Sequence, residues 1–235
     1  MFDKLLGGNI LYYPGCLTKF ARKDIKRNYM NLLRKARIDF IMLEKEELCC
    51  GSPVLNAGYP EEYENLKERS ISIFKEYGVK KIITGCPACY RMLKSYGTGI
   101  EIEHAATTIK KAIDSGRLKI KEKSKKEIIT FHDPCHLGRY SQIYDEPRGA
   151  LKKIYEIKEM KSIKDNSLCC GGGAGLPNNF SSIAKKVAKS RIKEAEETGA
   201  KRIVTPCPMC TEHLKNSSKK IEITEFSEAV INAVY

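Results

Sequence analysis

The chain has 235 residues, with 42 Lys and Arg against 29 Asp and Glu, and its formal charge is +13. This length can bury a sizeable core without disulfides, and 30% charged with 42% hydrophobic residues excludes a disordered chain. Apolar runs stay below the roughly 18 residues of a membrane span, and the N-terminal residues lack the pattern of an export signal, so we expect a cytoplasmic protein. Aromatic residues are not interleaved with the basic ones, which argues against nucleic-acid binding.

Strands and helices alternate along the first half of the chain. Short apolar runs predict strands at 9–13, 39–43, 82–84 and 100–102. Apolar residues at helical spacing predict helices over 19–36 and 60–77. The second helix begins with Pro and acidic residues and is followed by Gly78, which is typical of helix ends.

The second half repeats this alternation after a basic stretch. Residues 110–126 carry an excess of lysine and arginine and lack a sustained apolar period, so we expect a connection there. Beyond it, strands are predicted at 128–131, 203–205 and 221–223, and a helix over 180–198 that ends at Gly199.

Ten cysteines are an unusual number for a chain of this size without an export signal. They form two sets of five in the same order: Cys16, Cys49, Cys50, Cys86 and Cys89, then Cys135, Cys169, Cys170, Cys207 and Cys210. Successive intervals are 33, 1, 36 and 3 residues in the first set and 34, 1, 37 and 3 in the second. Chance does not produce such agreement, so the sequence is an internal tandem duplication.

The duplication and the alternation of elements together predict the fold class. We expect an α/β protein made of two tandem, pseudo-symmetric, Rossmann-like parallel βα repeats, at 9–109 and 127–235, joined by the basic connection 110–126. Ligands of parallel α/β sheets sit beyond the carboxyl ends of the strands. Each cysteine set contains members that directly follow predicted strands, so all five should meet at one end of one small sheet.

Three kinds of site compete for five converging thiols. Disulfides need an oxidising compartment, and a bond between the adjacent Cys49 and Cys50 would be strained. Zinc takes four ligands, and a cubane [4Fe–4S] cluster takes four thiolates, so either leaves a fifth cysteine unused. Counting suggests a cluster with more open metal sites than a cubane, although spacing alone does not establish the geometry.

The order Cys, Cys-Cys-Gly, Cys-x-x-Cys resembles the CCG cysteine-rich domain, and both copies are complete. Over residues 9–235 the chain is similar to the B-type subunit of heterodisulfide reductase from methanogens and to its relatives. These include iron–sulfur subunits of glycolate, lactate and glycerol-3-phosphate dehydrogenases and of thiol:fumarate reductase. In the disulfide-reducing subunits each complete copy ligates a noncubane [4Fe–4S] cluster. The resemblance therefore implies two such clusters, one on each five-cysteine set.

The resemblance also implies a function and partners. It suggests an iron–sulfur subunit of a multi-subunit oxidoreductase that splits a disulfide substrate between the two clusters, beside a ferredoxin-like iron–sulfur subunit and a flavoprotein subunit. The segment 90–134 is shorter than in heterodisulfide reductase, which leaves the substrate open. The sequence has neither a ferredoxin-type cysteine run nor a dinucleotide-binding glycine motif after a strand, so a partner has to deliver electrons. The alternatives are an electron-relay or quinone-linked subunit of a flavin dehydrogenase, and a structural zinc module.

Histidines flank one predicted cluster ligand. His136, which follows Cys135 at the expected start of a helix, is the candidate catalytic acid for a product thiolate. A hydrogen bond from His136 to a cluster sulfur, or a structural role, is the alternative. We expect His132 to be packed inside its strand, and His104 and His213 carry no functional signal.

A glycine run follows the second cysteine pair. Residues 171–175 contain four glycines, whose successive N–H groups can form a nest around cluster sulfides, and a flexible turn is the alternative. The first copy has Pro53, which lacks an N–H, at the corresponding stretch. We therefore expect the two clusters to differ in potential.

Overall fold

The structure is a computed structural model that describes residues 8–121 and 124–235. The N-terminal residues 1–7, on which the expectation of no export signal rests, lie outside the described residues. Within the described ranges, none of the helices combines the length and the apolar character needed to cross a membrane.

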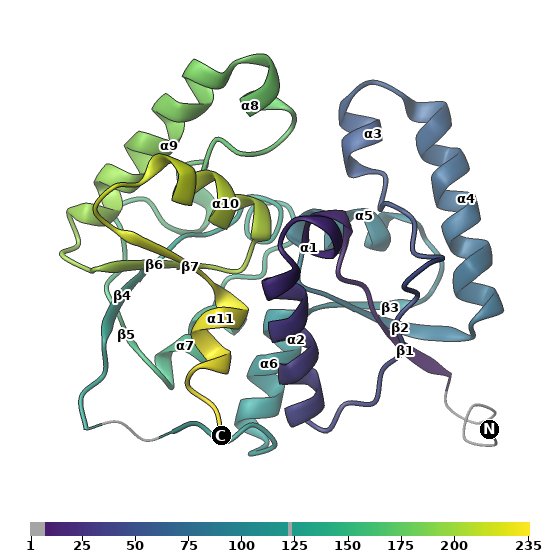
Figure 1. Ribbon diagram of the computed structural model, residues 1–235, viewed down its shortest axis with the longest axis horizontal. Helices are drawn as coiled ribbons and strands as arrows, with labels where there is room; N and C mark the ends of the chain where they lie inside the picture. Colours follow the sequence, from purple (N-terminus) through teal and green to yellow (C-terminus); the bar gives the residue numbers. More distant parts are fainter. Residues whose placement is uncertain (1–7, 122–123) are drawn as a thin grey trace.

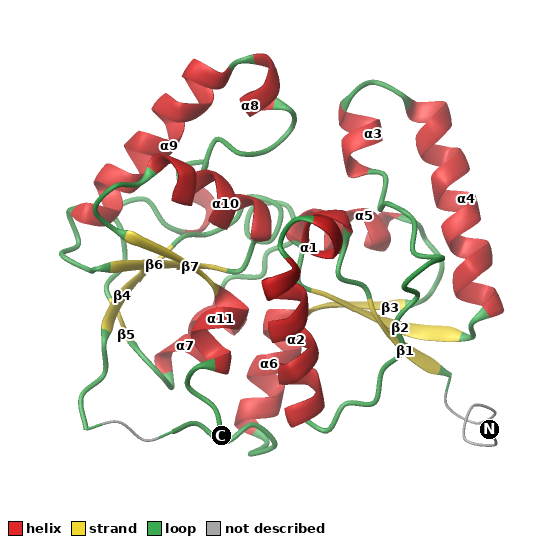
Figure 2. Cartoon of the chain, in the orientation of Figure 1, coloured by secondary structure: helices red, strands yellow, loops and turns green. Residues whose placement is uncertain are grey.

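Each half of the chain builds one parallel sheet (Figures 1 and 2). The first sheet runs in the order β1 (Asn9–Tyr12), β2 (Val79–Thr84) and β3 (Glu101–His104). The second runs in the order β5 (Glu156–Ile157), β4 (Ile128–Phe131), β6 (Arg202–Thr205) and β7 (Glu222–Glu225). Since β1-β2-β3 and β4-β6-β7 hold equivalent places, the predicted α/β fold with two Rossmann-like parallel repeats is confirmed.

Helices connect the strands in both repeats. The first repeat contains α1 (Cys16–Phe20), α2 (Lys23–Lys35), α3 (Ser52–Asn56), α4 (Pro60–Glu76), α5 (Pro87–Ser95) and α6 (Ala105–Asp114). The second contains α7 (Asp145–Lys152), η2 (Lys164–Asn166), α8 (Leu176–Asn179), α9 (Ser181–Glu196), α10 (Pro208–Ser217) and α11 (Phe226–Ile231). The helices predicted over 60–77 and 180–198 are confirmed as α4 and α9.

A shared core joins the two repeats. Helices α2, α6, α7 and α11 lie between the two sheets in Figure 1, with α2 packed on α11 and α6 packed on α7. Buried residues of both repeats form one cluster there, including Tyr29, Leu32, Ile109, Phe131 and Phe226. Burying each large apolar side chain stabilises the fold by about 1.5–3 kcal/mol. The opposite faces of the sheets carry separate cores, one under α4 and α5 and one under α9 and α10.

The predicted basic connection is partly built into this core. Residues 110–114 are the end of α6, and Leu118 is only 3% exposed. Ile120 pairs with Val234 in an isolated bridge near the end of the chain. Residues 122–123 lie outside the described part, and the predicted repeat boundaries remain predictions.

The helix predicted over 19–36 is divided in two. The backbone leaves the helical conformation at Arg22, with φ −113° and ψ 61°. The Arg22 guanidinium donates to Asp24 in the first turn of α2 and to Glu212 of α10. These bonds hold the break in place and link the two repeats.

Two other predictions are wrong in part. The strand predicted at 39–43 shrinks to a single bridge between Ile41 and Leu11, because only Ile41 pairs its N–H and C=O with the edge of β1. The short β5, which holds the equivalent place in the second sheet, was not predicted. The helix expected to start at His136 is a turn instead, closed by bonds such as Tyr140 N–H to Cys135 C=O, and Gly138 within it is a poor helix former.

Candidate functional site

Each five-cysteine set gathers at the carboxyl end of its own sheet, as predicted. Cys16 begins α1 after β1, Cys86 follows β2, and Cys89 lies in the first turn of α5. The adjacent Cys49 and Cys50 lie in the loop before α3. The second set occupies the equivalent places around β4, β6, α8 and α10.

Neighbouring thiols influence one another's pKa in the same order in both sets. In the first set the links run Cys16, Cys49, Cys50, Cys89, Cys86. In the second they run Cys135, Cys169, Cys170, Cys210, Cys207. All ten cysteines are free, so no disulfide competes with a shared ligand.

Neighbouring thiols stabilise a thiolate in each set. Hydrogen bonds from Cys49 and Cys89 lower the pKa of Cys50 to about 5. Hydrogen bonds from Cys135 and Cys170 lower the pKa of Cys169 to about 2. The thiolate is the form that binds a metal, so both sets are poised as ligand groups.

Helix ends and backbone N–H groups add to this preference for negative charge. Cys86 and Cys207 are the N-cap residues of α5 and α10, each followed by proline in the first turn. The sulfur of Cys207 accepts a hydrogen bond from the Cys210 N–H at 3.4 Å. The positive ends of both helix dipoles therefore face the sulfurs.

The glycine run places N–H donors on the second cysteine pair. Gly171 donates to the Cys169 sulfur and Gly172 to the Cys170 sulfur, each at 3.3 Å. Gly51 and Ser52 occupy the equivalent positions, and their N–H groups lower the pKa of Cys49 and Cys50. Pro53, one residue further on, does not remove these two N–H groups, but among the described residues hydrogen bonds of the geometry made by Gly171 and Gly172 occur in the second repeat only.

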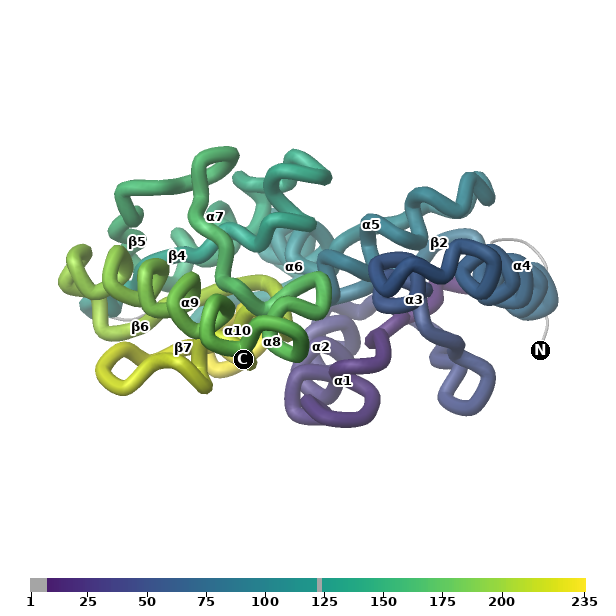
Figure 3. Tube along the Cα trace, turned by 90° about the horizontal axis from the view of Figure 1, so that it is seen from above, coloured from purple at the N-terminus to yellow at the C-terminus, as the bar shows by residue number. Residues whose placement is uncertain are grey.

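One cleft of about 640 Å³ opens onto both sets. Its lining includes Cys16, Cys50, Cys86, Cys89, Cys135, Cys169, Cys170, Cys207 and Cys210. Residues of α1, α3, α8 and α10 line it. Figures 1 and 3 show α1 and α3 on the side of the first repeat and α8 and α10 on the side of the second. The arrangement brings a single small molecule within reach of both sets.

His136 lies at this cleft, between the two repeats. Its ring packs 5.3 Å from the Tyr140 ring, over which Arg91 of α5 stands at 4.3 Å. Its Nδ1 is buried and has no hydrogen-bond partner within the described part of the chain. Burial, followed by the charge of Arg91, lowers the pKa of His136 below its usual value, so the imidazole is mainly neutral near pH 7.

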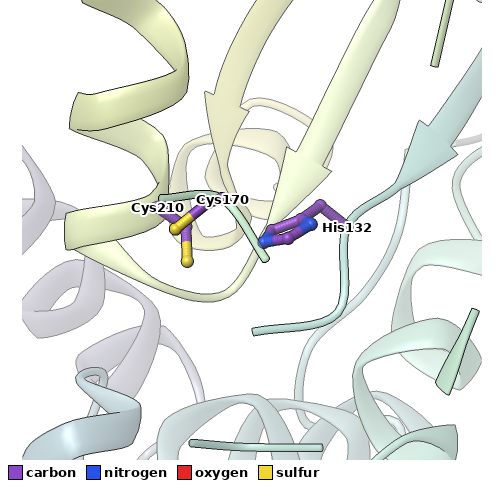
Figure 4. A group of neighbouring side chains, drawn as sticks. All are labelled: His132, Cys170 and Cys210. Atoms are coloured by element: carbon purple, nitrogen blue, oxygen red, sulfur yellow. The ribbon is translucent and has the colours of Figure 1, made fainter. Parts of the chain in front are cut away.

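His132 is packed, as predicted, although it follows β4 rather than lying within it. It is 1% exposed, and its Nδ1 accepts a hydrogen bond from Arg191 Nε at 3.0 Å. Burial and the charge of Arg191 lower the pKa of His132 to about 3. Figure 4 shows its ring directed at Cys170 and Cys210, and one donor atom from each of the three residues lies within 4.8 Å of the others.

Some residues of the cleft carry no signal in the sequence. His213 of α10 lines it and packs against Gly172, where a Cβ would lie 2.8 Å from the His213 Cβ. Four asparagines from α3, α8 and α10 also line it: Asn56, Asn178, Asn179 and Asn216. By contrast, His104 is fully buried and caps α6, consistent with a role in the core.

Known proteins are similar to this chain over most of its length. The D-type subunit of the dihydromethanophenazine:CoB–CoM heterodisulfide reductase from Methanosarcina mazei is 31% identical over 96% of this chain and 58% of its own length. The EtfAB:quinone oxidoreductase of Syntrophomonas wolfei is 32% identical over 92% of this chain and 32% of its own. The probable iron-sulfur-binding oxidoreductase FadF of Bacillus subtilis is 29% identical over 90% and 31%, respectively.

Two facts qualify these similarities. The chain spans 58% or less of the length of these three relatives. The heterodisulfide reductase relative is the D-type subunit, whereas the sequence pattern suggested the B-type, so the predicted subunit differs from the one found.

The family itself follows from both repeats. The cysteine-rich domain named CCG matches residues 10–94 and again residues 129–215. The two matches hold all ten cysteines of the site. The chain therefore belongs to the CCG cysteine-rich domain family.

Proposed function

We propose that this chain is an iron–sulfur subunit of an oxidoreductase and that its two cysteine sets act together on a disulfide. The opening of both sets into one cleft, which nine of the ten cysteines line, carries this proposal. One sulfur of a disulfide substrate can then face the first cysteine set while the other sulfur faces the second. A single set could not address both ends at once.

The donor atoms fit an iron–sulfur cluster in each repeat. Five sulfurs converge with thiolate-favouring hydrogen bonds, helix ends and backbone N–H groups around them. Zinc or a cubane would leave one sulfur of each set without a metal. The residues proposed to hold two [4Fe–4S] clusters, of the noncubane type, are Cys16, Cys49, Cys50, Cys86, Cys89, Cys135, Cys169, Cys170, Cys207 and Cys210.

The reaction needs two electrons and two protons. When bound, each cluster supplies one electron and open iron sites. The disulfide R–S–S–R′ is reduced, its S–S bond breaks, and the products are RSH and R′SH. We propose that His136 takes up a proton from solvent and hands it to one product sulfur, while solvent protonates the other, because His136 lines the cleft and its buried Nδ1 has no partner among the described residues.

The electrons come from other proteins in this proposal. The chain offers no dinucleotide-binding glycine motif, so we propose a ferredoxin-like iron–sulfur subunit and a flavoprotein subunit as its redox partners. The similarity to proteins named as oxidoreductases, all longer than this chain, supports such partners.

A second candidate function is a relay that passes electrons toward a quinone. The similarity to EtfAB:quinone oxidoreductase and to FadF favours it. In that case the clusters would exchange electrons without binding a disulfide.

Turnover separates the two functions. Anaerobic protein with its clusters loaded is mixed with a dye reduced by one electron and with a panel of alkyl disulfides, and thiol release is measured. The proposal predicts thiol release by the intact protein and none by Cys89→Ser or Cys210→Ser, each of which damages one set. Reduction of a quinone analogue without any thiol release would support the relay instead.

A further inference from the structure

A buried imidazole stands behind the second cysteine set. His132 is 1% exposed, and its ring extends toward the sulfurs of Cys170 and Cys210 in Figure 4. Its Nε2 is buried and lacks a hydrogen-bond partner among the described residues. A polar atom in this position costs free energy unless it gains a partner when the site is filled.

The hydrogen bond from Arg191 fixes the tautomer of His132. Arg191 is 0% exposed, and its Nε donates to His132 Nδ1 at 3.0 Å. Arginine has no acceptor, so Nδ1 has to accept, and a neutral ring then carries its proton on Nε2. The nitrogen that faces the sulfurs is therefore an N–H donor and not a metal ligand.

Other bonds hold Arg191 in place. Its Nη1 donates to the Glu194 carboxylate at 2.6 Å and to the Ser162 carbonyl at 2.8 Å. A fully buried guanidinium thus stands directly behind the imidazole. Its position is set by its bonds to Glu194 and Ser162.

We propose that His132, oriented by Arg191, donates its Nε2–H to a sulfur of the cluster in the second repeat and makes that cluster easier to reduce than the first. This inference rests on the proposed iron–sulfur function. A hydrogen bond to sulfur stabilises the extra negative charge of the reduced state and so raises the reduction potential. His132 is a positioning and tuning residue here, and it carries no step of the reaction.

The first repeat lacks this donor. Tyr13 precedes Cys16 by the same three residues that separate His132 from Cys135. The Tyr13 hydroxyl donates its proton to the Leu48 carbonyl at 2.6 Å and so does not offer it to a sulfur of the first set. Backbone N–H groups also donate to sulfurs of the second set, as from Gly171, Gly172 and Cys210. The pair His132 and Arg191 is the side-chain donor added to them, and a variant at His132 isolates its share of the difference in potential.

The test is an EPR-monitored redox titration of anaerobic, cluster-loaded protein, with iron counted in each sample. His132→Phe keeps a ring but removes the N–H, and we expect one of two transitions to fall. The expected size is about a tenfold loss in the reduction equilibrium constant, or about 59 mV for one electron. The other transition should stay in place, and His132→Gln, which keeps an N–H donor, should recover most of the loss.

Tyr13→Phe is the matched control, because it removes a side-chain donor beside the first set that does not face a sulfur. It should move neither transition. Full iron with unmoved potentials in His132→Phe would overturn the proposal. A wild-type protein without acid-labile sulfide would instead refute the proposed function, before any variant is considered.

A second measurement needs no variant. Histidine labelled with ¹⁵N should give the reduced protein a weak nitrogen coupling in ENDOR spectra, of the size that crosses a hydrogen bond. A coupling as large as that of a directly bonded nitrogen, or the absence of any histidine coupling, would overturn the proposal even if His132→Phe failed to fold.

Discussion

Gly15 brings the backbone against a cysteine of the first set. Its φ is +79°, and a Cβ there would lie 2.8 Å from the Cys89 sulfur. With ψ 158°, Gly15 lies in a region of backbone conformation that is essentially restricted to glycine. An alanine there costs about 1–3 kcal/mol, and its methyl group would also displace the sulfur. We predict that Gly15→Ala loses the iron of the first set and keeps that of the second, as measured by iron content per chain.

Gly116→Ala is the control for this change. Gly116 has nearly the same φ, +73°, but no atom lies within 4 Å of a Cβ built on it. It therefore imposes the strain of a positive φ without touching a sulfur, and full iron is expected. Equal iron in the two variants would show that the close approach at Gly15 does not matter.

His136 is the side chain on which proton transfer is proposed to depend. His136→Gln keeps hydrogen-bonding ability but removes the acid, so disulfide turnover should fall by about 10²-fold while iron content stays complete. The measurement is thiol release at saturating reduced dye. Unchanged turnover would make His136 a bystander, and lost iron would make it a structural neighbour of the cluster.

The convergence of the ten cysteines could be predicted from the sequence, but the other residues that line the cleft could not. Ten cysteines at repeated intervals indicate two equivalent sites from the sequence alone, because few other arrangements require that spacing. His213 and the four asparagines reach the cleft only because α3, α8 and α10 turn those faces toward it. Short helices of ordinary composition carry no such signal.

At the scale of elements, the end of β7 contains a buried carboxyl group between the repeats. Glu225 is 0% exposed, and it accepts hydrogen bonds from the Tyr29 hydroxyl of α2 at 2.7 Å and from the Ser227 N–H at 2.6 Å. Burial raises its pKa to about 7 from an ordinary value of 4.5. In the folded protein Glu225 therefore keeps a proton that the unfolded chain has already released.

The raised pKa of Glu225 makes the free energy of unfolding depend on pH in a defined direction. Between pH 4.5 and 7 the folded state binds more protons than the unfolded state, so stability from this group falls as the pH rises and levels off above 7. Relative to Glu225→Gln, the wild-type protein should lose up to about 3 kcal/mol across this window. Denaturant unfolding under anaerobic conditions at several pH values measures the difference.

Glu222→Gln, on the same strand but exposed, is the control for a change of charge. A difference between the wild-type protein and Glu225→Gln that stays constant over this range would contradict the buried, protonated carboxyl.

The elements predicted best are those with a full apolar pattern and a marked end. Helix α4 begins at Pro60 and stops before Gly78, and both signals are local. The edge strand at 39–43 was overpredicted, since its apolar residues pack on the core while only Ile41 pairs with β1. The break at Arg22 depends on Glu212, 190 residues away, which local pattern cannot reveal.

At the scale of the whole molecule, the duplication explains why two sites share one cleft. The central helices α2, α6, α7 and α11 bury a common core and hold the two sheets as one body. The carboxyl ends of the strands in both sheets, and the cysteines that follow these strands, therefore open onto the same cleft. Two separate repeats would have given two separate sites.

The central claim is that each repeat holds an iron–sulfur cluster, and metal analysis tests it most directly. Protein purified without oxygen should contain about eight iron and eight acid-labile sulfide per chain, as two four-iron clusters require. Stoichiometric zinc without acid-labile sulfide would contradict the account.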